Sequence, residues 1–68
     1  ITPHAYLVQA RLRLARRLLA EGHSPADTAF MAGFADQSHL GRWFQRAYRI
    51  SPAHYRRLCT NLPDVSKK

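Results

Sequence analysis

The chain has 68 residues and a formal net charge of +7, with 11 Lys and Arg against 4 Asp and Glu. Its length allows one small domain at most, and a composition of 46% hydrophobic and 22% charged residues is that of a folded domain rather than a disordered segment. The excess of positive charge favours a polyanionic partner, although a need for solubility also accounts for basic small domains.

Cysteine usage and hydropathy indicate a cytoplasmic protein. The single cysteine, Cys59, excludes an internal disulfide and fits a reducing compartment. No apolar run approaches the roughly 18–20 residues of a membrane span, and residues 1–7 lack the pattern of a signal peptide. Because the chain starts at Ile1 without Met, we expect it to be a fragment of a longer protein.

Pairs of a hydroxyl residue followed by proline predict where helices begin. The Ser or Thr side chain accepts a hydrogen bond from the first turn, and proline at the first helical position has no N–H to satisfy. The pairs are Thr2-Pro3, Ser24-Pro25 and Ser51-Pro52. Asp36 predicts the cap of a further helix. The helices predicted in this way cover residues 3–20, 25–32, 37–48 and 52–59. The fold class is therefore all-α.

The first predicted helix carries nearly two apolar stripes. The first stripe has the spacing of a buried face, encloses Arg11, and comprises Val8, Leu12, Ala15, Leu18 and Leu19. The second stripe comprises Tyr6, Leu7, Ala10 and Leu14. A helix that packs against one core needs one stripe. The second stripe therefore either widens the buried face of a small domain or contacts a subdomain that is absent from this chain.

The third predicted helix has an apolar face and a polar face. The residues predicted to point inward are Leu40, Trp43, Phe44 and Ala47. The opposite face comprises Ser38, Arg42, Gln45 and Arg49, with His39 and Arg46 on one flank and Gln37 and Gly41 on the other. In the fourth predicted helix, Tyr55 and Leu58 are expected to point inward.

The second and third predicted helices fit a helix-turn-helix unit. Ala29 suits a close helix crossing, Gly33 suits the turn four residues later, and Phe34 follows as an apolar plug. In such a unit the second helix lies in the major groove of DNA, where an arginine can donate to guanine O6 and N7 and a glutamine can pair with adenine. Gly41 costs about 1 kcal/mol of helix stability relative to alanine. Glycine at this position is explained if the helix backbone must approach a partner closely. A generic helical hairpin with a solvated polar face is the alternative.

Three stretches in register resemble the AraC/XylS family of bacterial regulators. Residues 29–46, AFMAGFADQSHLGRWFQR, resemble the family's second helix-turn-helix, whose signature runs A-x-x-x-G-F-x-D-x-S-x-[FL]-x-R-x-F-x-[KR]. Residues 50–57, ISPAHYRR, resemble its closing segment, and residues 11–19 resemble its linker helix. Ile1-Thr2-Pro3 resembles the end of its first unit, so the resemblance covers residues 1 to 58.

The resemblance implies a four-helix, homeodomain-like helix-turn-helix subdomain over residues 1–60. Its parts are a linker helix at 3–20, the second helix-turn-helix at 25–48 and a closing helix at 52–59, with a flexible tail at 61–68. Three residues are unusual for the family: Leu40 is less common there than phenylalanine, Trp43 replaces a smaller residue, and Arg49 is the third. Arg49 stands where the family has glycine, and a left-handed arginine there would be strained.

The resemblance also implies a function, which is sequence-specific binding of double-stranded DNA by a cytoplasmic, nucleoid-associated transcriptional regulator. The positions that match base contacts or their neighbours are Gln37, Ser38, His39, Gly41, Arg42 and Gln45. The candidate phosphate contacts are Arg46, Arg49, Arg56 and Arg57. The further partners that it implies are a missing N-terminal helix-turn-helix unit, an effector or dimerisation domain, and RNA polymerase.

Other classes of function have less support in the sequence. The residues that could ligate a metal have no metal-site spacing, so we expect neither a metal nor a cofactor; they are His4, His23, His39, His54 and Cys59. Few carboxylates are present and none is paired, which argues against an enzyme. The main alternative is a helical protein–protein interaction module that uses Tyr6, Leu7 and Leu14. A weaker alternative is a membrane-surface site, but its arginines wrap around their helix; they are Arg11, Arg13, Arg16 and Arg17.

Overall fold

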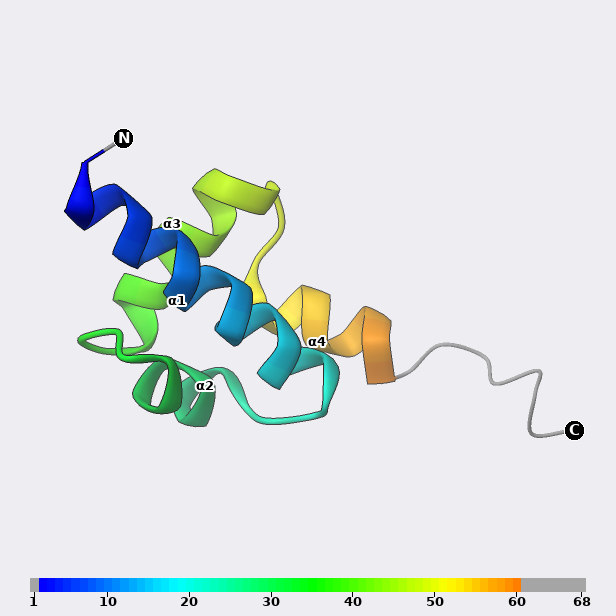
Figure 1. Cartoon of the computed structure of the whole chain (residues 1–68). Coiled ribbons are helices and arrows are strands. Elements are labelled where there is room, and N and C mark those ends of the chain that lie inside the picture. Colours follow the sequence, from blue (N-terminus) through cyan, green and yellow to red (C-terminus); the bar gives the residue numbers. More distant parts are fainter. Residues whose placement is uncertain (1, 61–68) are drawn as a thin grey trace, which may run out of the picture.

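The computed structural model describes residues 2–60, which form four helices (Figure 1). The helices are α1 (Pro3–Ala20), α2 (Pro25–Ala32), α3 (Gln37–Tyr48) and α4 (Pro52–Thr60). The prediction of an all-α helix-turn-helix fold is confirmed. Helix α4 extends to Thr60, one residue beyond its predicted end. The predicted tail, residues 61–68, lies outside the described residues.

The side chains that precede each helix form the caps that the sequence predicts. In every case a side-chain oxygen accepts a hydrogen bond from a backbone N–H of the first turn, and each such cap stabilises its helix by about 1 kcal/mol. Three of these bonds measure 3.1 Å and join Ala5 N to Thr2 Oγ1, Asp27 N to Ser24 Oγ, and His54 N to Ser51 Oγ. The fourth measures 2.8 Å and joins His39 N to Asp36 Oδ1.

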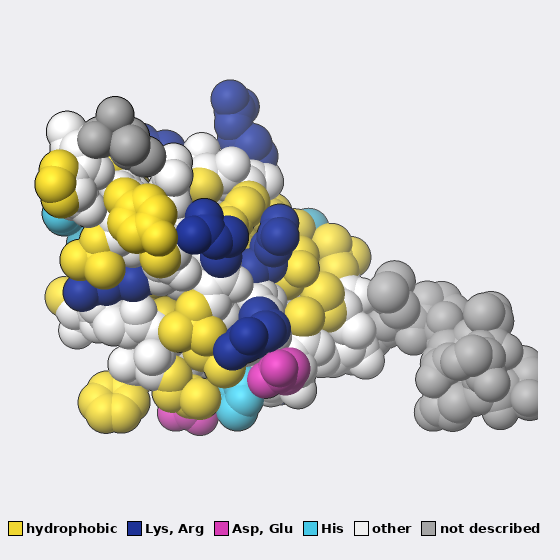
Figure 2. All heavy atoms as spheres, in the orientation of Figure 1, with side chains coloured by type: hydrophobic (Ala, Val, Ile, Leu, Met, Phe, Trp, Pro, Cys, Tyr) yellow, Lys and Arg dark blue, Asp and Glu magenta, His cyan; other side chains and the backbone are white. Residues whose placement is uncertain are grey.

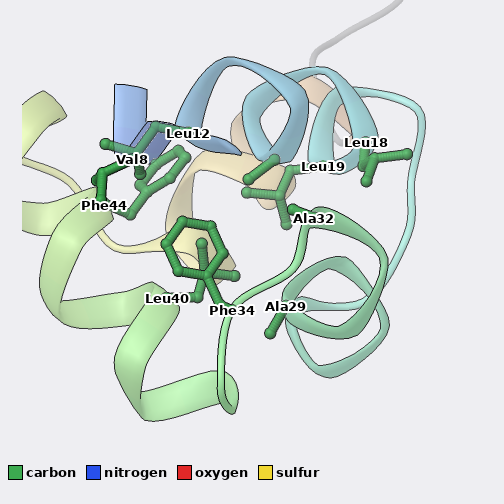
Figure 3. Close-up of a cluster of buried hydrophobic side chains, with 10 residues drawn as sticks. Val8, Leu12, Leu18, Leu19, Ala29, Ala32, Phe34, Leu40 and Phe44 are labelled. Carbon is green, nitrogen blue, oxygen red and sulfur yellow. The ribbon is translucent and has the colours of Figure 1, made fainter. Parts of the chain in front are cut away.

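Helix α1 lies across the other three helices and packs most extensively against α2 and α4 (Figure 1). All five residues of its first apolar stripe are buried. The same core cluster includes Phe34, Leu40 and Phe44, which come from the turn after α2 and from α3, and Figure 3 shows Val8 and Leu12 beside Phe44. The core therefore lies between α1 and the helix-turn-helix unit. It holds α3 by its apolar face and leaves the opposite face free.

The turn between α2 and α3 depends on Gly33, which has φ 90° and ψ 20°. After it, the Phe34 N–H donates to the carbonyl of Ala29 at 2.9 Å, which closes the end of α2 in the manner of a Schellman motif. A Cβ on Gly33 would lie 3.1 Å from Nε of Arg11. The arginine inside the first stripe of α1 thus packs its side chain across this glycine, and Phe34 enters the core beyond it.

Two residues that were predicted to point inward lie at the surface. Ala47 is exposed beside a groove of about 250 Å³ between α1 and α3, where the two helices diverge and leave part of the α3 face uncovered. Leu58 is 46% exposed. The inward face of α4 instead follows the spacing i, i+3, i+4 and i+7, which is Pro52, Tyr55, Arg56 and Cys59. The inward prediction was therefore wrong for Leu58, whereas Ala47 faces α1 across the groove but is not buried.

Candidate nucleic-acid interface

The outward face of α3 is polar, positively charged and uncovered. Leu40 and Phe44 are completely buried on the opposite face and fix the rotation of the helix about its axis. The core therefore determines the direction in which the polar side chains point. The side chains of this face are all exposed and comprise Gln37, Ser38, Arg42, Gln45, Arg46 and Arg49. Such a set can offer both bidentate donors and amides to a ligand.

His39 differs from the other predicted base-contacting residues because its ring turns toward the protein. The indole Nε1 of Trp43 donates to Nε2 of His39 at 3.0 Å, and the backbone N of Ala35 lies 3.2 Å from its Nδ1. A neutral imidazole has one nitrogen with a free lone pair, so we assign the accepted bond to the half-buried Trp43. The edge of the ring also meets Phe34, with 5.5 Å between ring centroids. His39 therefore ties the start of α3 to the preceding turn.

The four predicted phosphate-contacting arginines lie in different surroundings. Arg57 is exposed on α4, and the guanidinium carbon of Arg46 lies over the Trp43 ring, 5.7 Å from its centroid. Arg56 is half-buried, and its Nε donates to the carbonyl of Gly22 at 2.9 Å. Arg56 thus joins α4 to the turn between α1 and α2, which is a structural role.

Arg49 ends α3 in the left-handed conformation, with φ 63° and ψ 26°, and its N–H donates to the carbonyl of Gln45 at 2.8 Å. Glycine adopts this conformation without the steric cost of a Cβ. We expect Arg49→Gly to stabilise the fold by about 1 kcal/mol, measured by urea denaturation. Arg49→Ala removes the same charge but keeps the Cβ, and serves as the control. Equal stability of the two variants would contradict strain at this position.

Helix α1 contributes positive charge that the site prediction did not include. The guanidinium of Arg16 lies 5.2 Å from the centroid of the Tyr48 ring, at the C-terminal end of α3. Arg13 and Arg16 line a hollow of about 340 Å³ together with Tyr48 and Ala47. Periodicity within α1 does not predict that Arg16 lies beside Tyr48, because only tertiary packing brings α1 and α3 together. Figure 2 shows that basic and hydrophobic side chains alternate over the α1 side of the molecule.

The Tyr55 side chain, which lies beneath α3, has a raised pKa. Burial raises the pKa of Tyr55 above its ordinary 10.0, and the neighbouring Cys59 raises it further. The ring of Tyr55 lies 5.6 Å from that of Phe44. Tyr55 therefore supports the buried side of α3 in its neutral form. Among residues 2–60, no three His, Cys, Asp or Glu side chains gather in a way that could hold a metal ion.

Comparison with known proteins finds a helix-turn-helix family and several transcriptional regulators. A family model described as a helix-turn-helix domain matches residues 1–58. The probable transcriptional regulator LumQ of Photobacterium leiognathi is 43% identical over 56 residues, which are 81% of this chain and 23% of LumQ. The transcriptional activator NphR of a Rhodococcus species is 47% identical over 57 residues, or 82% of this chain and 17% of NphR.

A more distant relative is the HTH-type transcriptional regulator MtrA of Neisseria gonorrhoeae, which is 34% identical over 58 residues, or 84% of this chain and 19% of MtrA. The chain thus spans less than a quarter of the length of each of these three relatives. No solved structure gives a significant match. Within residues 2–60, none of the helices combines the length and hydropathy of a membrane span.

Proposed function

This chain belongs to the AraC-type helix-turn-helix family of transcriptional regulators, and we propose that it reads specific sequences of double-stranded DNA with α3 in the major groove. Its relatives LumQ and NphR are described as a probable transcriptional regulator and a transcriptional activator. The observation that carries the proposal is the uncovered polar face of α3, held from behind by two fully buried side chains. A helix is about 10–12 Å in diameter with its side chains, which matches a major groove about 12 Å wide.

The base-reading side chains in this proposal are those that are exposed on α3. Arg42 donates to O6 and N7 of a guanine, while Gln37 or Gln45 pairs with N6 and N7 of an adenine. Ser38 reads either kind of base edge as donor or acceptor. We leave His39 out of this set, because its ring is engaged with Trp43.

The phosphate contacts in this proposal are Arg46, Arg49 and Arg57, which are exposed and form no ion pair with an acidic side chain among residues 2–60. We leave Arg56 out because its guanidinium is held by the carbonyl of Gly22. Contacts with phosphates provide affinity and fix the register on the duplex, whereas contacts with bases provide specificity. Substitutions in the two sets should therefore have different signatures.

Arg42→Ala is expected to weaken binding to the preferred duplex by about 1–3 kcal/mol and to abolish preference at one base pair. The matched control is Arg57→Ala, which removes an equal charge. It should weaken binding to all sequences alike and lower the salt slope by about one. Affinities across a library of duplexes measure both effects. Indistinguishable profiles for the two variants would refute the separation of base-reading and phosphate-binding roles.

The outward side of α1 supports a further part of the proposal. Tyr6 and Leu7 are 61% and 44% exposed, whereas Leu14 packs partly against the core. The apolar contact surface is thus smaller than the second stripe suggested. In the whole protein we assign it to a preceding helix-turn-helix unit, with an effector or dimerisation domain and RNA polymerase as further partners in the cytoplasm. The alternative is that Tyr6 and Leu7 dock an unrelated protein, since exposed apolar patches attract partners.

A further inference from the structure

Gly41 lies in the middle of α3, where glycine weakens a helix. Its backbone is helical, so no turn or left-handed conformation requires glycine there. Apart from its two chain neighbours and the adjoining backbone of α3, a Cβ built on Gly41 meets no atom of residues 2–60 within 4 Å, so packing does not require glycine either. Alanine at such a position favours the folded state about fivefold over glycine. Within the described residues, nothing in the fold therefore explains why glycine, with its lower helix stability, stands at this position.

The surroundings of Gly41 are those of the proposed interface. It precedes Arg42 and lies one turn after Gln37 and one turn before Gln45, on the same side of the helix. All three of these side chains are exposed. Because Gly41 has no side chain, the two glutamines border a place where the helix backbone itself is accessible.

We propose that Gly41 is the point at which the backbone of α3 comes closest to DNA, and that it thereby sets the depth of the helix in the groove. This inference rests on the proposed function. A methyl group at this position would stand between the backbone and the duplex and displace the helix outward. Hydrogen bonds from Gln37, Arg42 and Gln45 to base edges would then lengthen, and such bonds weaken steeply once their geometry departs from the ideal.

The test separates helix stability from DNA contact by using two opposite substitutions. Gly41→Ala adds a methyl group to the proposed interface, whereas Ala47→Gly removes one from the exposed flank beside the α1–α3 groove. The double variant combines them and should have the stability of the unchanged chain. Stability is measured by urea denaturation. Affinity is measured by fluorescence anisotropy on a duplex that the unchanged chain selects from a random library, and on an unrelated duplex.

We expect Gly41→Ala to be about fivefold more stable in its unfolding equilibrium and to bind the selected duplex at least about tenfold more weakly. Ala47→Gly should be less stable but bind as the unchanged chain does, and the double variant should keep the loss of affinity. If Gly41→Ala binds as tightly as a binding-competent unchanged chain, this inference is overturned and the proposed function stands. If the unchanged chain binds no duplex, the proposed function is overturned, and the inference with it.

Discussion

Phe44→Ala is expected to remove a large part of the stability of the fold at 25 °C. The Phe44 side chain is completely buried, and its ring lies 4.8 Å from that of Tyr48 and 5.6 Å from that of Tyr55. Truncation of a buried phenylalanine costs about 3–5 kcal/mol, while a domain of this length has roughly 3–10 kcal/mol of total stability. Circular dichroism and urea denaturation measure the loss.

The control for this substitution is Phe30→Ala on α2. Phe30 is 85% exposed, so its removal changes little buried surface and should alter stability by less than about 0.5 kcal/mol. The two variants remove the same side chain from the same small domain. Equal stability of the two would mean that Phe44 does not anchor α3, and the rotation of the proposed reading face would then have no support.

Binding to duplex DNA is expected to fall steeply with salt. Each neutralised phosphate contributes about −0.9 to the slope of log K against log[salt], so the contacts of Arg46, Arg49 and Arg57 predict a slope of about −2.7. Affinity should then fall about 40-fold between 50 and 200 mM salt. Titrations at several salt concentrations measure the slope. A slope near zero would remove the nucleic-acid function.

A matched variant separates local contacts from net charge. Arg17 is exposed on α1, and its Nε lies 4.0 Å from a carboxylate oxygen of Glu21. Arg17→Ala and Arg49→Ala lower the net charge equally. Only Arg49→Ala should reduce the magnitude of the salt slope, by about one, because counterions are released at the phosphates that the protein contacts. Equal slopes for these variants would show that overall charge, rather than the α3 surface, governs binding.

Helix boundaries and the face of α3 could be predicted from the sequence because their causes are local. A hydroxyl side chain reaches a backbone N–H three residues away, so the pairs Thr2-Pro3, Ser24-Pro25 and Ser51-Pro52 specify helix starts wherever the helices later pack. Leu40 and Phe44 lie four residues apart and must share one face of a helix. Their burial then follows from the hydrophobic effect, and the polar residues necessarily point away.

The partners of individual side chains were decided by the tertiary structure. Arg56 and Arg57 are neighbours of the same type, yet packing of α4 brings Arg56 to the carbonyl of Gly22 and leaves Arg57 in solvent. Leu58 is exposed because the buried face of α4 contains Cys59, the next residue, in its place. Periodicity within a helix gives the relative directions of its side chains, but which direction is buried depends on neighbours that are distant in sequence.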